Sequence, residues 1–97
     1  MNIGPSIRLA VDSGKVELGL DRALKSAING GAKLIVIASN CPRAVELKQY
    51  CAASKTPAVE FEGSGVDLGA VCGKPFSISV LTVFEEGNSD ILKAVKS

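Results

Sequence analysis

Helical and strand-like patterns alternate along the whole chain, and this alternation constrains its fold more than any other feature. Apolar residues recur at helical spacing in three segments, 3–11, 23–28 and 44–54. Short apolar or alternating segments typical of strands lie between and after them, at 15–18, 34–38, 58–61 and 77–84. Two further helices are predicted after polar caps, one from Ser64 with Asp67 three residues later, and one from Asn88 through Ile91, Leu92 and Val95.

The resulting order of five helices and four strands predicts an α/β fold with a sheet between helical layers. Leu34–Ala38 is apolar throughout, which is typical of a strand covered on both faces. Residues 77–84 are predicted to be the longest strand, and Pro42 is predicted to begin the third helix. The 97 residues fit one domain, spanning 1–97, with a core of modest size.

Histidine is absent, and the three cysteines form no CxxC pair, which together exclude most catalytic and zinc-binding arrangements. Without histidine there is no Ser-His or Cys-His nucleophile pair. The sequence therefore predicts a protein that is not an enzyme and has no cofactor or metal. One alternative stays open: Cys41 stands beside a predicted helix start, where a thiolate can be stabilised and act as a nucleophile.

Three free cysteines, no apolar run long enough for a membrane span and no leader pattern at Met1 predict a cytoplasmic protein that does not contact a membrane. Lys and Arg number 11 against 10 Asp and Glu, a net charge of +1. Nucleic-acid-binding domains usually carry a clear basic excess. If this chain binds RNA, recognition has to rest on local charge, backbone amides and shape.

Loops that begin helices are the candidate binding elements, because free amide groups at a helix start suit phosphate. Gly19 allows a backbone to approach closely, and Arg22 and Lys25 share a helix face shortly after it. This pattern suits contacts to phosphates or base edges, and it equally suits a solvated surface helix. Asn40 suits a helix cap, or an amide that pairs with a base edge.

Phe76 follows Lys74 and Pro75 where a helix leads into a strand. An aromatic ring beside a lysine can stack on an unpaired base. A core position at the start of a strand is the competing interpretation, and the pattern favours it because aromatic rings dominate core burial.

Four stretches in this order and spacing carry a resemblance to a known family: residues 18–25, 31–42, 66–76 and 87–92. On these stretches the chain resembles the L30e family of large-subunit ribosomal proteins of archaea and eukaryotes. The wider group is the kink-turn binders typified by ribosomal protein L7Ae. The resemblance implies a three-layer α/β/α sandwich with a mixed four-stranded sheet.

The resemblance also implies binding to a kink-turn of ribosomal RNA, an internal loop with a sharp bend and sheared G·A pairs. It implies neighbouring large-subunit proteins as partners, a place in the ribosome and a free form that is monomeric. The residues it assigns to RNA binding are Gly19, Leu20, Arg22, Lys25, Asn40, Gly73, Lys74, Pro75 and Phe76. Family members usually carry a basic residue near the start of the second helix, where this chain has Asp21.

Other functions remain as alternatives at the level of sequence. A kink-turn binder of a small RNA-guided modification particle or a tRNA-processing particle would use the same surface, although Gly87–Ile91 favours the ribosomal branch. An enzyme with Cys41 as nucleophile would lose turnover on alkylation. A module that binds only proteins would show no RNA affinity above the nonspecific level.

Overall fold

The structure, a computed structural model, describes residues 4–41, 43–89 and 91. Its helices and strands follow the predicted alternation from the first helix to the fourth strand: α1 Gly4–Ser13, β1 Lys15–Leu18, α2 Leu20–Asn29, β2 Leu34–Ala38, α3 Ala44–Ala53, β3 Ala58–Phe61, α4 Gly65–Val71 and β4 Val80–Glu85. Of the fifth predicted helix, Leu92 and Val95 lie outside the described residues. Ile91 is described, and its side chain is fully buried.

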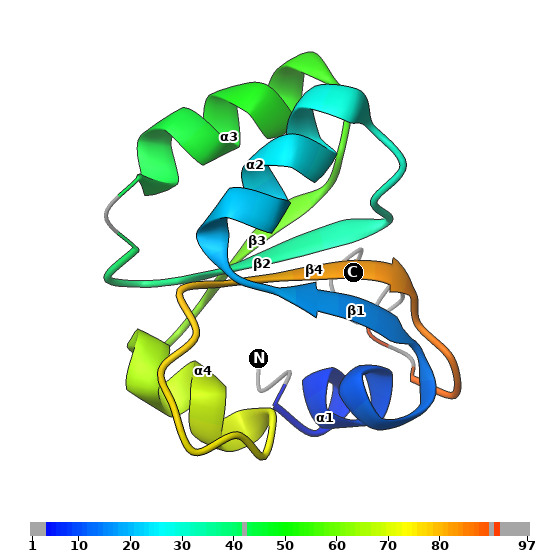
Figure 1. Cartoon of the computed structure of the whole chain (residues 1–97), viewed down its shortest axis with the longest axis vertical. Coiled ribbons are helices and arrows are strands. Elements are labelled where there is room, and N and C mark those ends of the chain that lie inside the picture. The colour runs from blue at the N-terminus through cyan, green and yellow to red at the C-terminus, as the bar shows by residue number, and fades with distance from the viewer. Residues whose placement is uncertain (1–3, 42, 90, 92–97) are drawn as a thin grey trace.

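The four strands form one mixed sheet in the order β1-β4-β2-β3 (Figure 1). β4 pairs antiparallel with both β1 and β2, whereas β2 and β3 are parallel. β1, β2 and β3 therefore all end at the same edge of the sheet, and β4 begins there. The mixed four-stranded sheet that the resemblance implies is confirmed.

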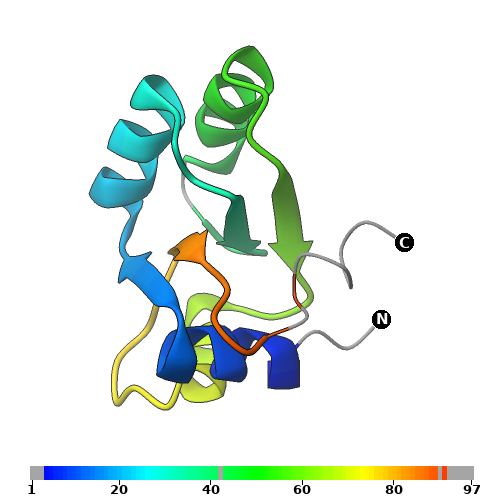
Figure 2. The same cartoon turned by 90° about the vertical axis from the view of Figure 1, so that its right-hand side faces the viewer.

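Helices cover both faces of the sheet, with α1 and α4 on one face and α2 and α3 on the other (Figure 2). β2 shows why two layers are needed, since all five of its side chains are buried. Leu34, Val36 and Ala38 join the apolar cluster under α1 and α4. Ile35 and Ile37 join the cluster under α2 and α3. The prediction of a strand covered on both faces, and of an α/β/α sandwich, is confirmed.

Two predicted boundaries are wrong. β4 begins at Val80 rather than at residue 77, because the preceding segment is tied to other elements. Ile78 N–H donates to the Gly65 carbonyl at the start of α4 (2.8 Å), so the segment is bound to α4 before it reaches β2, where Ala38 N–H donates to the Ser79 carbonyl (2.8 Å). Helix α3 begins at Ala44 with Arg43 in the capping position, two residues after the expected start.

Thr82, in the middle of β4, carries a buried hydroxyl without a hydrogen-bond partner among the described residues. We expect Thr82→Val to raise the free energy of unfolding by about 1 kcal/mol, because it removes an unpaired polar group at nearly constant shape. Urea unfolding measures this as a higher midpoint with an unchanged slope.

Thr56→Val is the matched control, because the Thr56 hydroxyl is buried but lies 2.9 Å from the Ser54 hydroxyl as a hydrogen-bond partner. This substitution should lower the stability. If both variants shifted the midpoint in the same direction, the unpaired state of the Thr82 hydroxyl would not be the cause.

Candidate functional site

The edge of the sheet where three strands end gathers most of the loops that the sequence singled out. This edge lies at the left of Figure 1, where β1 leads into α2, β2 leads towards α3, and the segment before β4 rises from α4. Strand register places Leu18 opposite Leu81 and Ile37 opposite Val80, so the neighbouring strands β1, β4 and β2 are level at this edge. The loops therefore project from one rigid platform.

A hollow of about 200 Å³ lies between the end of β1 and the segment before β4. We call it the strand-end hollow, and its lining residues are Leu18, Gly19, Leu20, Phe76, Ser77, Ile78 and Ser79. Two stretches predicted to contact RNA, residues 19–20 and Phe76, meet here although 55 residues lie between Leu20 and Phe76 in the sequence.

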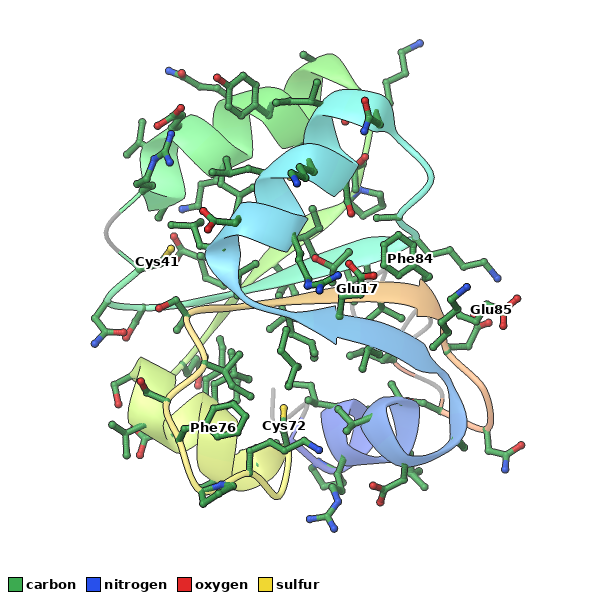
Figure 3. All side chains as sticks on the ribbon, in the orientation of Figure 1. Glu17, Cys41, Cys72, Phe76, Phe84 and Glu85 are labelled. Carbon is green, nitrogen blue, oxygen red and sulfur yellow. The ribbon has the colours of Figure 1, made fainter. Side chains whose placement is uncertain are left out.

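Phe76 is 54% exposed, so the interpretation that favoured a core phenylalanine is wrong. The core position in this segment is taken by Ile78, which is 3% exposed. Backbone contacts hold the Phe76 ring outside: a Cβ at Gly69 of α4 would lie 2.0 Å from the Phe76 carbonyl oxygen, so the two backbones touch. Figure 3 shows the ring beside α4 on this loop.

Asn40 lies in the loop between β2 and α3. Its side chain joins this loop to the start of α4, which covers the other face of the sheet from α3. The Gly65 N–H donates to Asn40 Oδ1 (2.9 Å), so the side chain supplies an acceptor to the first residue of α4. It does not cap α3, where Arg43 occupies the capping position. Because Oδ1 faces a donor, the orientation of the amide is fixed and its NH₂ group faces away from Gly65.

Helix α4 begins with the predicted capping box, which is confirmed. Ser64 Oγ accepts from Asp67 N–H, and Asp67 Oδ2 accepts from Ser64 N–H (3.1 Å). Val66 follows in the first turn and is 69% exposed. Sequence reasoning did not select this residue, although it stands off the buried face formed by Gly65, Leu68 and Gly69. Its apolar character at a position outside this buried face was the signal in the sequence that could have identified Val66 as a candidate contact residue.

Arg22 and Lys25 lie on a different surface from Phe76. Both line a hollow of about 560 Å³ between α2 and the strands β1 and β4. Arg22 Nη1 lies 3.4 Å from Glu17 Oε1, and both side chains are substantially exposed. Asp21, the residue that departs from the family pattern, lines the same hollow. The structure thus separates the predicted basic contacts from the strand-end hollow.

Gly73, Lys74 and Pro75 are exposed at the far end of α4, and they do not line the strand-end hollow. Gly73 has a positive φ of 77°, and its N–H donates to Ala70 O (3.0 Å), so it terminates the helix. A Cβ at Gly73 would lie 2.6 Å from Arg8 Nη1, which places it beside α1. Among residues 73–76, only Phe76 joins the strand-end hollow.

Arg43 is a second residue that the sequence did not single out. Its guanidinium donates to both carboxylate oxygens of Glu46, at 2.9 and 2.6 Å. These hydrogen bonds raise the pKa of Arg43 and lower the pKa of Glu46. The ion pair thus fixes the position of the Arg43 guanidinium at the start of α3, three residues after Asn40.

The cysteines offer little reactivity. All three are buried, and Cys41 is 8% exposed within the cluster under α2 and α3. Burial raises the pKa of the thiols of Cys51 and Cys72, which opposes thiolate formation. Among the residues described, no group of three or more potential metal ligands is gathered. Within the same ranges, no helix combines the length and apolar character that a membrane crossing requires.

Comparison with known proteins gives consistent results. Residues 1–93 match a family model described as Ribosomal protein L7Ae/L30e/S12e/Gadd45 family. Three similar proteins carry the name large ribosomal subunit protein eL30. The protein of Methanosarcina mazei is 44% identical over 97% of this chain and 89% of its own length. That of Methanosphaera stadtmanae is 44% identical over 96% and 97%. That of Trypanosoma brucei brucei is 43% identical over 95% and 90%. These names agree with the prediction that the chain is not an enzyme.

Proposed function

Because this chain belongs to the ribosomal protein L7Ae/L30e/S12e/Gadd45 family, we propose that it is a component of the large ribosomal subunit that binds a kink-turn of ribosomal RNA. It acts in the cytoplasm on the ribosome, beside other large-subunit proteins, and performs no catalysis. The free protein is monomeric. The names of the relatives support the ribosomal assignment.

The observation that carries the kink-turn proposal is the meeting of Gly19, Leu20 and Phe76 around one open hollow. An unpaired base needs an apolar surface to stack on and polar groups for its edge. Leu20 and Phe76 supply the apolar surface. Gly19 presents a bare backbone, since a Cβ there would have nothing within 4 Å.

Asn40 supplies the polar group. Its Oδ1 is engaged by Gly65 N–H, so the NH₂ group is the part left to donate to an acceptor on a base edge. A side chain held in one orientation loses little conformational entropy on binding, which favours affinity. Asn40 thus serves the fold through its oxygen and RNA through its nitrogen.

The near-neutral charge fits a protein that reads shape. With a net charge of +1, few phosphates are neutralised and few counterions are released. Recognition then depends on unpaired bases and backbone groups. The affinity should therefore fall only gradually as salt is raised.

A gel-shift titration at fixed salt tests the proposal. The RNAs are a kink-turn and a control in which the G·A pairs are converted to Watson–Crick pairs. A large preference for the kink-turn is expected, whereas equal weak binding to both would refute kink-turn recognition. Co-sedimentation with large subunits then separates the ribosome from the small RNA-guided modification and tRNA-processing particles.

Phe76→Ala should weaken kink-turn binding by about 1–3 kcal/mol, the scale of one base stacked on an aromatic ring. Stability should change little, because the ring is already 54% exposed in the free protein. The measurements are the dissociation constant by gel shift and the urea midpoint of the same preparation.

Leu9→Ala is the matched control, since it removes a similarly exposed apolar side chain (47%) from α1. This control should bind as tightly as the original protein. Equal affinity of the Phe76 and Leu9 variants would show that no base stacks on Phe76.

A further inference from the structure

The hollow beside α2 is larger than the strand-end hollow and has a different chemistry. We call it the α2–β1 groove; residues that line it include Glu17, Asp21, Arg22, Lys25, Asn29 and Phe84. Its volume of about 560 Å³ lies within the range of sites that hold small organic molecules. In Figure 3 the side chains of Glu17 and Phe84 lie close together below α2. The groove exists because the layer of α2 and α3 does not fully cover its side of the sheet and leaves that face of the edge strand β1 open.

The groove combines an aromatic floor with a rim of charged side chains of both signs. Phe84 is only partly buried, and it lies on the same face of β4 as Val80 and Thr82, towards α2. Arg22 and Lys25 are one turn apart on α2 and form one rim. Glu17 on β1 forms the other. Asp21 of α2 also lines the groove, which therefore offers two cations and two carboxylates around an aromatic surface. These groups suit the phosphate, the amino groups and the base of a nucleotide.

The α2–β1 groove and the strand-end hollow share a border. Glu17, Asp21 and Arg22 line the groove, while the three residues between Glu17 and Asp21 line the hollow. The boundary is therefore the single turn from β1 into α2. At its centre stands Gly19, whose missing side chain leaves open space. A nucleic-acid strand can cross this turn without meeting a side chain at Gly19.

The ion pair that spans the groove does not block it. Arg22 and Glu17 are 3.4 Å apart, with side chains 66% and 36% exposed. Exposed pairs of this kind are weak, because solvent screens their charges. A phosphate, which Arg22 can bind with two parallel hydrogen bonds, is a stronger partner. Release of Glu17 then leaves its carboxylate free to accept from a base amino group.

We propose that the α2–β1 groove holds a further nucleotide of the bound RNA, with its base on Phe84 and its phosphate between Arg22 and Lys25. This inference rests on the proposed RNA-binding function. The RNA strand leaves the strand-end hollow, crosses the turn at Gly19 and enters the groove. Arg22 and Lys25 therefore contact a different nucleotide from the one that Phe76 holds.

Phe84→Trp gives a direct probe, because the chain contains no tryptophan. Kink-turn RNA with a strand extended past the bend should quench the emission of this tryptophan as it binds. Phe84→Leu should lower the affinity for the extended RNA about five- to hundredfold, as expected for one lost stacking contact. An RNA trimmed after the nucleotide at the strand-end hollow should bind both forms equally.

The charge requirement is tested by the double variant Arg22→Gln and Lys25→Gln. Loss of one phosphate contact should reduce the slope of log affinity against log salt by about one. The control removes the same charge elsewhere: Lys48→Gln with Lys55→Gln, on and just after α3, where Lys48 pairs with Glu60 of the opposite edge strand. An equal change in both double variants would overturn the specific role of the groove.

The outcomes separate this inference from the proposed function. If the gel shift shows kink-turn binding but the tryptophan emission does not change, the groove is empty and only this inference falls. If the protein does not bind the kink-turn, the proposed function fails, and a single-stranded oligonucleotide then probes the groove alone. Absence of quenching by that oligonucleotide, or quenching by a protein partner in its place, would overturn the inference as well.

Discussion

Asn40→Asp is expected to weaken kink-turn binding by about 1–3 kcal/mol while leaving the fold as stable as before. The aspartate keeps an acceptor for Gly65 N–H, which Asn40 Oδ1 now receives at 2.9 Å. A negative charge at the start of α4 is also favourable for the helix dipole. The substitution removes the NH₂ donor and brings a carboxylate towards RNA. The measurements are gel-shift affinity and urea unfolding.

Asn40→Ala separates the two roles. It should weaken RNA binding to a similar degree and, in addition, lower the free energy of unfolding by about 1–3 kcal/mol, because the buried Gly65 N–H loses its acceptor. Kink-turn affinity that stays unchanged in the aspartate variant would show that Asn40 is purely structural.

Gly69→Ala should be the most damaging small substitution near the site, with a loss of about 3 kcal/mol in unfolding free energy. Its Cβ would lie 2.0 Å from the Phe76 carbonyl oxygen and 3.1 Å from the carbonyl carbon. Neither atom belongs to a flexible side chain, so α4 and the Phe76 loop have to move apart. RNA affinity should fall too, because the loop carries Phe76 into the strand-end hollow.

Ala70→Ser on the exposed side of the same helix is the matched control. It should change neither the urea midpoint nor the affinity by a measurable amount. If Gly69→Ala unfolded at the same urea concentration as Ala70→Ser, the close approach of the two backbones would not be needed for stability.

The fold was largely predictable because its signals are local. The fully apolar run Leu34–Ala38 predicted a strand covered on both faces, and Ser64 with Asp67 predicted the start of α4. The start of β4 was not predictable in the same way. Residues 77–79 have the composition of a strand, but Ile78 hydrogen-bonds to Gly65, a partner that only the tertiary fold supplies.

The arrangement of the candidate site residues was less predictable than the fold. Sequence pattern alone favoured a buried Phe76, because apolar character does not reveal that Ile78 fills the core instead. The alternatives for Asn40 were a cap for α3 or a contact to a base; in the structure its Oδ1 accepts from Gly65 N–H, at the start of α4. That Arg22 and Lys25 face a separate groove depends on the position of β1, which no local pattern encodes.

The position of β4 between β1 and β2 also affects how the chain folds during synthesis. Among the described residues β4 is the last strand in the sequence, yet both β1 and β2 pair with it. Until residues 80–85 leave the exit tunnel, β1 has no strand to pair with and one side of the apolar β2 stays open. Nascent chains should therefore stay sensitive to protease until residues 80–85 have left the tunnel, and then become resistant abruptly.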